Sequence, residues 1–243
     1  MTTTVTGLRV LSYNIAGRRG DRAAQARLVR HLAPDVALVQ EAPRRLGWRH
    51  RCAALAHAWG MVVAVGGMPA MGNLVLTSLR VQVVRTWCVR FPLTPGRHLR
   101  GAAFAHCRLP DGGELVAVGA HLATDAAERP AQADRLRALL DELRPPVVLG
   151  ADVNDEPGSH AWRALSGRLR DPAAGLAPVA TFPRSGRRID AVFVDGRLTV
   201  TGYRVVDTPA ARAASDHLPV VADLEVPGLD RSAPARDDAI RTR

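Results

Sequence analysis

The sequence contains no lysine, so each of its 33 basic side chains is an arginine. Against 23 acidic side chains, these arginines give the chain a net charge of +10. Guanidinium groups bind phosphate oxygens in pairs, which favours a polyanionic partner such as nucleic acid. The arginines are scattered rather than grouped in blocks, and the coding bias of a GC-rich genome would produce the same composition. Both interpretations stay open at this point.

Cysteine is also scarce, and long apolar runs are missing. The three cysteines have no C-x-x-C spacing, which fits reduced thiols and argues against a disulfide framework or a zinc site. No apolar run is long enough to span a membrane. Residues 1–7 have neither the basic region nor the apolar core of a signal peptide. We therefore expect a cytoplasmic, monomeric protein that does not insert into membranes.

The most informative stretch is the apolar run that starts at Val147 and ends in Asp152-Val153-Asn154. It predicts a buried strand, and residues two apart in a strand point to the same side. Asp152 and Asn154 should therefore face one site together. Taken alone, such a pair is more typical of a turn. A calcium loop is excluded, because Pro157 stands where that loop needs glycine.

At 243 residues, the chain can bury the core of one large domain. We predict that this domain covers residues 8–226, between a disordered leader at 1–7 and a disordered tail at 227–243. Hydrophobic spacing and turn residues predict helices at 21–33, 49–59, 128–143 and 159–166. The same patterns predict about five short strands between 61 and 122, and further strands at 8–14, 35–41, 147–154, 188–194, 198–206 and 217–226.

Polar residues collect where these predicted strands meet loops. Taken singly, each could be an ordinary turn residue, helix cap or buried imidazole. Together on one rim they predict a ligand site, since ligands in sheet-containing folds collect at strand ends. The residues are Asn14, Glu41, His121, Asp152, Asn154, Asp190, Asp216 and His217.

Six segments that carry these residues resemble, in order, the signature blocks of the endonuclease/exonuclease/phosphatase superfamily. They are residues 12–14, 39–41, 119–122, 150–154, 188–190 and 215–219, and the likeness spans about residues 8–226. The resemblance implies an α+β fold. This fold is a four-layer α/β/β/α sandwich of two mostly antiparallel sheets flanked by helices.

The resemblance also implies a metal site. Glu41 would be the principal ligand, assisted by Asn14 and by Asp216. A ligand set made only of oxygens implies Mg²⁺ or Mn²⁺ as cofactor rather than zinc.

The catalytic residues implied by the resemblance are Asp152, Asn154, Asp190, His217 and His121. Asp152 would deprotonate the attacking water, and Asn154 would hold the phosphate or that water. His217, oriented by Asp190, would bind a phosphate oxygen or transfer a proton. His121 would contact the phosphate or assist the leaving group.

The chain departs from the family pattern near His121. In deoxyribonuclease-like members a strand carboxylate supports this imidazole, and residues 72–78 contain none. That favours a binding role for His121. We also predict that Asn73, Arg100, Arg184 and Arg188 contact substrate. The arginines at 184–188 could follow a phosphate backbone or belong to a solvated loop.

The sequence thus predicts a metal-dependent phosphoesterase, in the first place a phosphodiesterase or nuclease. One alternative is a phosphatase or phospholipase of the same fold that acts on a lipid or inositol headgroup. Singly placed tryptophans and the lack of an apolar hairpin disfavour this alternative. The other alternative is a degenerate member that only binds phosphate.

Overall fold

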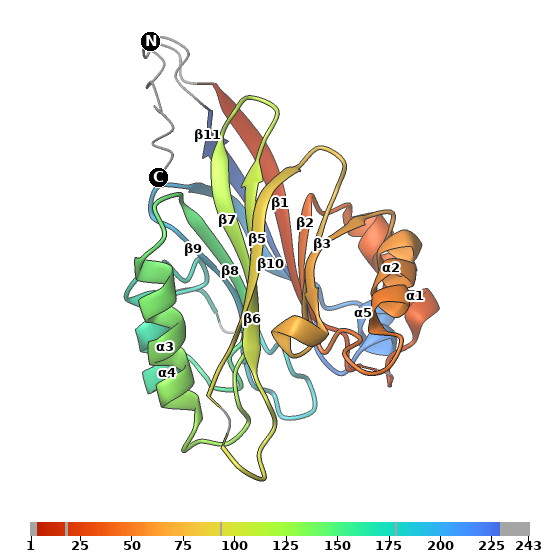
Figure 1. The fold of residues 1–243 in the computed structure, drawn as a ribbon, viewed down its shortest axis with the longest axis vertical. Coiled ribbons are helices and arrows are strands. Elements are labelled where there is room, and N and C mark those ends of the chain that lie inside the picture. Colours follow the sequence, from red (N-terminus) through yellow and green to blue (C-terminus); the bar gives the residue numbers. More distant parts are fainter. Residues whose placement is uncertain (1–3, 18, 93, 178, 229–243) are drawn as a thin grey trace, which may run out of the picture.

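Two β-sheets packed face to face form the centre of the computed structural model, which describes residues 4–228 except 18, 93 and 178 (Figure 1). One sheet has six strands in the order β10 (Thr199–Val205), β11 (Val220–Pro227), β1 (Val5–Asn14), β2 (Val36–Gln40), β4 (Asn73–Thr77) and β3 (Val62–Gly67). The other has five in the order β5 (Gln82–Arg90), β6 (Gly101–Arg108), β7 (Glu114–His121), β8 (Val147–Asp152) and β9 (Asp190–Val194).

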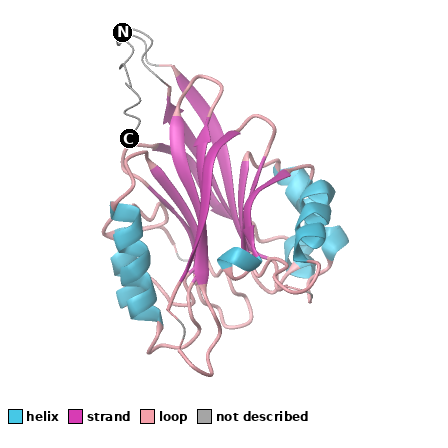
Figure 2. Ribbon diagram, viewed as in Figure 1, coloured by secondary structure: helices cyan, strands magenta, loops and turns pink. Residues whose placement is uncertain are grey.

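Helices cover the outer face of each sheet, as Figure 2 shows. The six-stranded sheet carries α1 (Arg22–Leu32), α2 (Trp48–Trp59) and α5 (Pro209–Ala214), and the five-stranded sheet carries α3 (Arg129–Asp141) and α4 (His160–Ser166). A 3₁₀ turn, η1 (Met68–Ala70), precedes β4. The predicted four-layer sandwich of the α+β class is therefore confirmed. Within the described residues, no helix is long and apolar enough to cross a membrane.

The inner faces of the two sheets approach each other closely near the ends of β1, β2, β7 and β8. Gly150 of β8 makes this approach possible, because a Cβ atom there would lie 2.8 Å from the Leu38 side chain and 2.9 Å from Ser12 Oγ. Any larger residue would push the sheets apart. The close packing places the ends of β1 and β2 directly opposite the ends of β7 and β8.

The directions of the strands bring their polar ends to one edge of the sandwich. Two neighbouring pairs are parallel, β1 with β2 and β7 with β8, and parallel strands end at the same edge of a sheet. His121 lies opposite Asp152 in the register of β7 and β8, and Asp152 lies opposite Asp190 across β8 and β9. Asn14 ends β1 beside Gln40 in the other sheet. One rim of the sandwich thus carries the predicted residues.

The structure corrects several predicted boundaries. The first strand starts at Val5 rather than residue 8, because residues 5–7 pair with residues 225–227 of β11. The predicted leader is thus strand at 5–7, and its residues 1–3 lie outside the described part. The predicted tail contributes Pro227 to β11, and its residues 229–243 are likewise outside the description. Helix α5 was not predicted, since its six residues are too short for a periodic pattern.

Candidate active site

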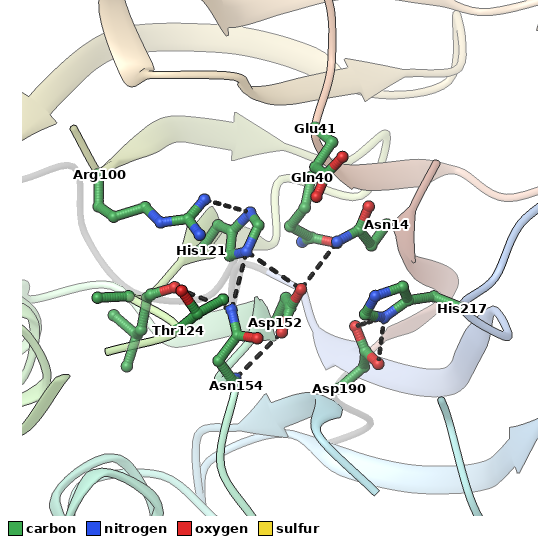
Figure 3. Close-up of polar contacts among 12 residues, drawn as sticks. Asn14, Gln40, Glu41, Arg100, His121, Thr124, Asp152, Asn154, Asp190 and His217 are labelled. Atoms are coloured by element: carbon green, nitrogen blue, oxygen red, sulfur yellow. Dashed lines mark hydrogen bonds and ion pairs between the residues drawn. The ribbon is translucent and has the colours of Figure 1, made fainter. Parts of the chain in front are cut away.

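Asp152 is the centre of the site, at the end of β8 and 1% exposed. Its Oδ2 accepts a hydrogen bond from the side-chain amide of Asn14 at 2.8 Å, and its Oδ1 accepts one from the backbone N–H of Asn154 at 3.0 Å. Figure 3 shows the carboxylate between these partners, with His121 on one side and His217 on the other. The carboxylate is therefore held in one orientation from both sheets.

The surroundings of Asp152 make its carboxyl group a stronger base than usual. Burial raises its pKa to about 7, and the nearby negative charge of Asp190 acts in the same direction. The charge of His217 and the hydrogen bond from Asn14 oppose this rise. A carboxylate with a pKa near neutrality is suited to accept a proton under physiological conditions.

His217 and Asp190 form a buried pair beside Asp152. The two oxygens of Asp190 lie 2.9 and 3.1 Å from His217 Nδ1. Burial disfavours the charged imidazolium, but the charge and hydrogen bond of Asp190 outweigh it and raise the pKa of His217 to about 9. With Nδ1–H bound to Asp190, the Nε2–H of the imidazolium is available to a substrate oxygen.

Two hydroxyl groups that were not among the predicted site residues, those of Thr181 and Ser215, hold this pair in place. Thr181 Oγ1 accepts hydrogen bonds from the backbone N–H groups of Ile189 and Asp190, both at 2.9 Å. Ser215 Oγ donates to the Asn14 carbonyl oxygen at 2.8 Å and accepts from the backbone N–H of His217 at 3.3 Å. Ser215 therefore connects the end of β1 with the turn that carries His217.

Both ring nitrogens of His121 contact other groups of the protein. Arg100 Nη1 lies 3.1 Å from His121 Nδ1. Arginine can only donate, so Nδ1 accepts and the imidazole proton resides on Nε2. Nε2 lies 3.2 Å from Asp152 Oδ2, which can accept that proton, and 3.0 Å from the side-chain nitrogen of Asn154. Burial and the charge of Arg100 lower the pKa of His121 well below its usual value. His121 is therefore a neutral residue that positions Asp152, and its contact with the phosphate or the leaving group stays a prediction.

Asn154 and Glu41 both have left-handed backbone conformations, with φ of 55° and 56°. Such conformations are uncommon outside glycine and concentrate at functional sites. Asn154 is fixed further by Arg129, a residue without a recognisable sequence signal. The Arg129 guanidinium donates to the carbonyl oxygens of Ala123, Thr124 and Asn154, joining the loops that follow β7 and β8.

Two carboxylates on the rim have oxygens that the protein leaves unused. Asp216 Oδ1 is buried and has no hydrogen-bond partner among the described residues. Glu41 has one cationic neighbour, Arg19, at 3.8 Å. The unpartnered buried oxygen of Asp216 is unfavourable unless a cation or donor binds it, and the Glu41 side chain is one-third exposed, so both carboxylates can take part in binding a hard divalent ion. A separate buried group, Asp152, Asp190 and His217, has ligand atoms within 4.8 Å of one another and could also hold an ion.

Two other predicted site residues are corrected, whereas the metal role of Asn14 stays a prediction. Asn14 donates its side-chain N–H to Asp152, and its side-chain oxygen accepts from the backbone N–H of Ala16 and keeps a second lone pair. Asn73 is fully buried. Its side-chain amide donates hydrogen bonds to the carbonyl oxygens of Ala70 and Gly101 and does not face a substrate. Arg188 is buried in an ion pair with Asp171 and stacks on Trp162.

Arg184, by contrast, lies on the rim. Its side chain is 73% exposed and its Nη1 is 3.9 Å from Asp216 Oδ2. Arg100 points to His121 from the side opposite Asp152 (Figure 3). Both arginines therefore remain predicted substrate contacts.

A buried carboxylate with a raised pKa, an imidazole–carboxylate pair and further carboxylates on one rim of an α/β/β/α sandwich are typical of phosphoester hydrolases. The profile described as the Endonuclease/Exonuclease/phosphatase family matches residues 11–217 of this chain. The chain therefore belongs to this family, whose members are hydrolases of phosphate esters. A search of the curated proteins returned no match to this sequence.

Solved structures show the same fold. An endonuclease/exonuclease/phosphatase from Beutenbergia cavernae is 28% identical, with a TM-score of 0.65 over 91% of this chain and 72% of that chain. The human Nocturnin catalytic domain with bound sulfate is 16% identical, with a TM-score of 0.73 over 92% and 97%. A mannosyl-6-phosphatase from Bacteroides thetaiotaomicron is 19% identical, with a TM-score of 0.69 over 89% and 99%.

Proposed function

We propose that this protein is a magnesium- or manganese-dependent phosphodiesterase that attacks phosphorus with a water molecule activated by Asp152. The observation that carries this proposal is the buried Asp152 carboxylate, whose pKa is raised to about 7 and which faces the His217–Asp190 pair. The net charge of +10 supports a polyanionic substrate, and we propose nucleic acid as the first class to test.

The hydrogen-bond pattern supports the following assignment of protons. Asp152 Oδ2 already accepts a hydrogen bond from Asn14 and faces His121. Among the described residues, Oδ1 accepts a hydrogen bond only from the backbone N–H of Asn154. Oδ1 therefore has a free lone pair that accepts the proton of the attacking water. His217 Nε2–H stabilises the charge that develops on a phosphate oxygen or donates to the leaving oxygen. Asp190 keeps the imidazolium oriented and charged.

Glu41 and Asp216 would hold the metal ion. When bound, the ion supplies positive charge to the phosphate oxygens. We do not place it in the Asp152–Asp190–His217 group, because His217 is protonated near neutral pH and an imidazolium has no lone pair to offer a cation. The test is a metal titration of the free protein.

Glu41→Gln is expected to weaken Mn²⁺ binding by roughly 10- to 100-fold, since it removes a charged ligand while keeping the shape of the side chain. Isothermal titration calorimetry with Mn²⁺ measures this directly. Asp141→Asn, an exposed carboxylate on α3 paired with Arg137, is the matched control and should bind Mn²⁺ like the wild type. Equal Mn²⁺ affinity in Glu41→Gln and wild type would contradict the metal assignment.

The rate should depend on pH with a maximum between about 7 and 9. Asp152 must be ionised to accept a proton, so kcat/KM rises as the pH increases through its pKa of about 7. His217 must be protonated to donate, so the rate falls as the pH passes its pKa of about 9. Asp190→Asn should move the alkaline limb to lower pH, because the charge of Asp190 favours the imidazolium. An alkaline limb that does not move in this variant would contradict the assignment to His217.

A further inference from the structure

A cavity of about 430 Å³ opens beside Glu41 and His121. We call it the arginine pocket, after the five arginines that line it: Arg22, Arg44, Arg45, Arg51 and Arg100. They come from α1, the loop after β2, α2 and the connection between β5 and β6, so four segments distant in sequence converge here. Glu41 is the one acidic residue among the described residues that line it.

The five pocket arginines have no ion pair with a carboxylate in the described part of the chain. A second cavity, which borders Asp216, is different. Its arginines, Arg19, Arg184 and Arg212, lie 3.8, 3.9 and 2.6 Å from carboxylate oxygens. Cations near a surface are normally scattered among anions, so an unbalanced group in a cavity indicates a site for an anion.

Arg100 gives the second, independent observation. Its side chain is more than nine-tenths buried, and its Nε has no hydrogen-bond partner among the described residues. Its Nη1 is engaged with His121 (Figure 3). Burial of this guanidinium is unfavourable, and Arg44 places another positive charge beside it. The charges of Asp152, Glu41 and Glu128 offset this in part, but none of these carboxylates forms an ion pair with Arg100 among the described residues. An anion bound in the pocket would supply the missing charge.

We propose that the arginine pocket binds a second, non-reacting phosphate group of the substrate. The preferred substrate then carries a phosphomonoester close to the ester that is hydrolysed. This inference rests on the proposed function and names its substrate class. A monoester bears about −1.5 to −2 charges near pH 7, against −1 for a diester, so five arginines facing one carboxylate favour the monoester. Guanidinium forks bind its oxygens in pairs.

Binding of inorganic phosphate tests the pocket without catalysis. We expect calorimetry in metal-free buffer to show phosphate binding that Arg45→Gln/Arg51→Gln weakens by roughly 10- to 100-fold, because two charged hydrogen-bond donors are lost. These two side chains form no hydrogen bond or ion pair within the described residues, so the fold should be kept, as a melting curve will show. The control Arg27→Gln/Arg30→Gln removes the same charge from exposed positions on α1, outside the pocket.

The calorimetric outcomes are decisive for the pocket. A dissociation constant that changes in the pocket variant and stays near the wild-type value in the control supports it. Absence of phosphate binding to the wild type, an unchanged constant in the pocket variant, or equal weakening by the control pair would each overturn it.

Hydrolysis of short nucleotides tests the substrate class. With Mg²⁺, kcat/KM for dithymidylate should be at least about 10-fold higher when one end carries a phosphate, and this preference should fall towards one in Arg45→Gln/Arg51→Gln. Equal rates with and without the terminal phosphate would overturn the inference and leave the proposed function intact. A higher kcat/KM for trithymidylate than for the phosphorylated dinucleotide would overturn the proposal that the pocket binds a phosphomonoester. The pocket would then bind a diester of the nucleic-acid backbone. Failure to cleave any of them would contradict the proposed function, and the calorimetry would still decide on the pocket.

Discussion

Asp152→Asn is expected to lower kcat by about three to four powers of ten, the upper part of the range for a general base. The amide has nearly the same shape as the carboxylate but cannot accept the proton of the attacking water. It also cannot accept from both Asn14 and the Asn154 backbone, because an amide has one acceptor atom where the carboxylate has two. Steady-state kinetics on a phosphodiester with saturating Mg²⁺ measures the loss.

Stability should change little in this variant. The raised pKa of Asp152 shows that the fold disfavours its ionised form, so a neutral amide relieves desolvation while losing a hydrogen bond worth about 1 kcal/mol. A melting temperature near that of the wild type would show that the kinetic loss is chemical. Asp141→Asn is the control for a carboxylate outside the site. Full turnover by a folded Asp152→Asn protein would show that another group activates the water.

Asp190→Asn and His217→Ala are each expected to lower kcat by about two to four powers of ten, and the double variant should lose little more. The two residues act in one step: Asp190 holds His217 Nδ1 at 2.9 Å and keeps the imidazole protonated. Removing either partner therefore removes the same function. Values of kcat measured for the wild type, the two single variants and the double variant complete this double-mutant cycle.

A second Asp–His pair in the same molecule provides the control for this cycle. Asp134 and His160 are 3.0 Å apart between α3 and α4, and both side chains are about half exposed. Asp134→Asn and His160→Ala should leave turnover unchanged. If losses in Asp190→Asn and His217→Ala simply add, or if Asp190→Asn melts early with normal turnover of the folded fraction, Asp190 has only a structural role.

The sequence predicts the strand ends well because a simple pattern encodes them. Each apolar run that stops at a polar residue marks one edge of a sheet, and parallel pairing of β7 with β8 brings His121 and Asp152 to that edge. The order of the strands in the two sheets carries no comparable local signal. The arrangement of the sheets depends on the packing of β1 and β2 against β7 and β8. The glycine at residue 150 permits this close packing.

The sequence could not predict which polar residues face inward. Asn73 and Arg188 lie in segments that resemble site loops, yet tertiary contacts with Gly101 and Asp171 bury them. Residues 72–78 contain no carboxylate that could support His121, and they do not reveal that Arg100 contacts its Nδ1 atom. Arg100 follows an exposed connection in the sequence, and only the folded chain brings it to His121 Nδ1.

The position of Arg100 has a consequence for mechanism. The charge of Asp190 favours the imidazolium form of His217, whereas burial and the charge of Arg100 disfavour the charged form of His121. The two histidines of this site therefore differ in charge: His217 is protonated near neutral pH and His121 is not. Of these two histidines, only His217 can donate a proton. We therefore expect a large loss of turnover in the Asp190→Asn and His217→Ala variants.

Hydrolysis of a phosphodiester in heavy-oxygen water is the most direct measurement of the central claim, water attack at phosphorus assisted by Asp152. With Mg²⁺ and bis(p-nitrophenyl) phosphate, the wild-type protein should release nitrophenol and a phosphomonoester that carries one heavy oxygen on phosphorus. Both products should disappear with excess chelator, and their rate should fall by about three to four powers of ten in Asp152→Asn. Undiminished turnover in chelator, or heavy oxygen in the released nitrophenol instead of the phosphate, would contradict the account.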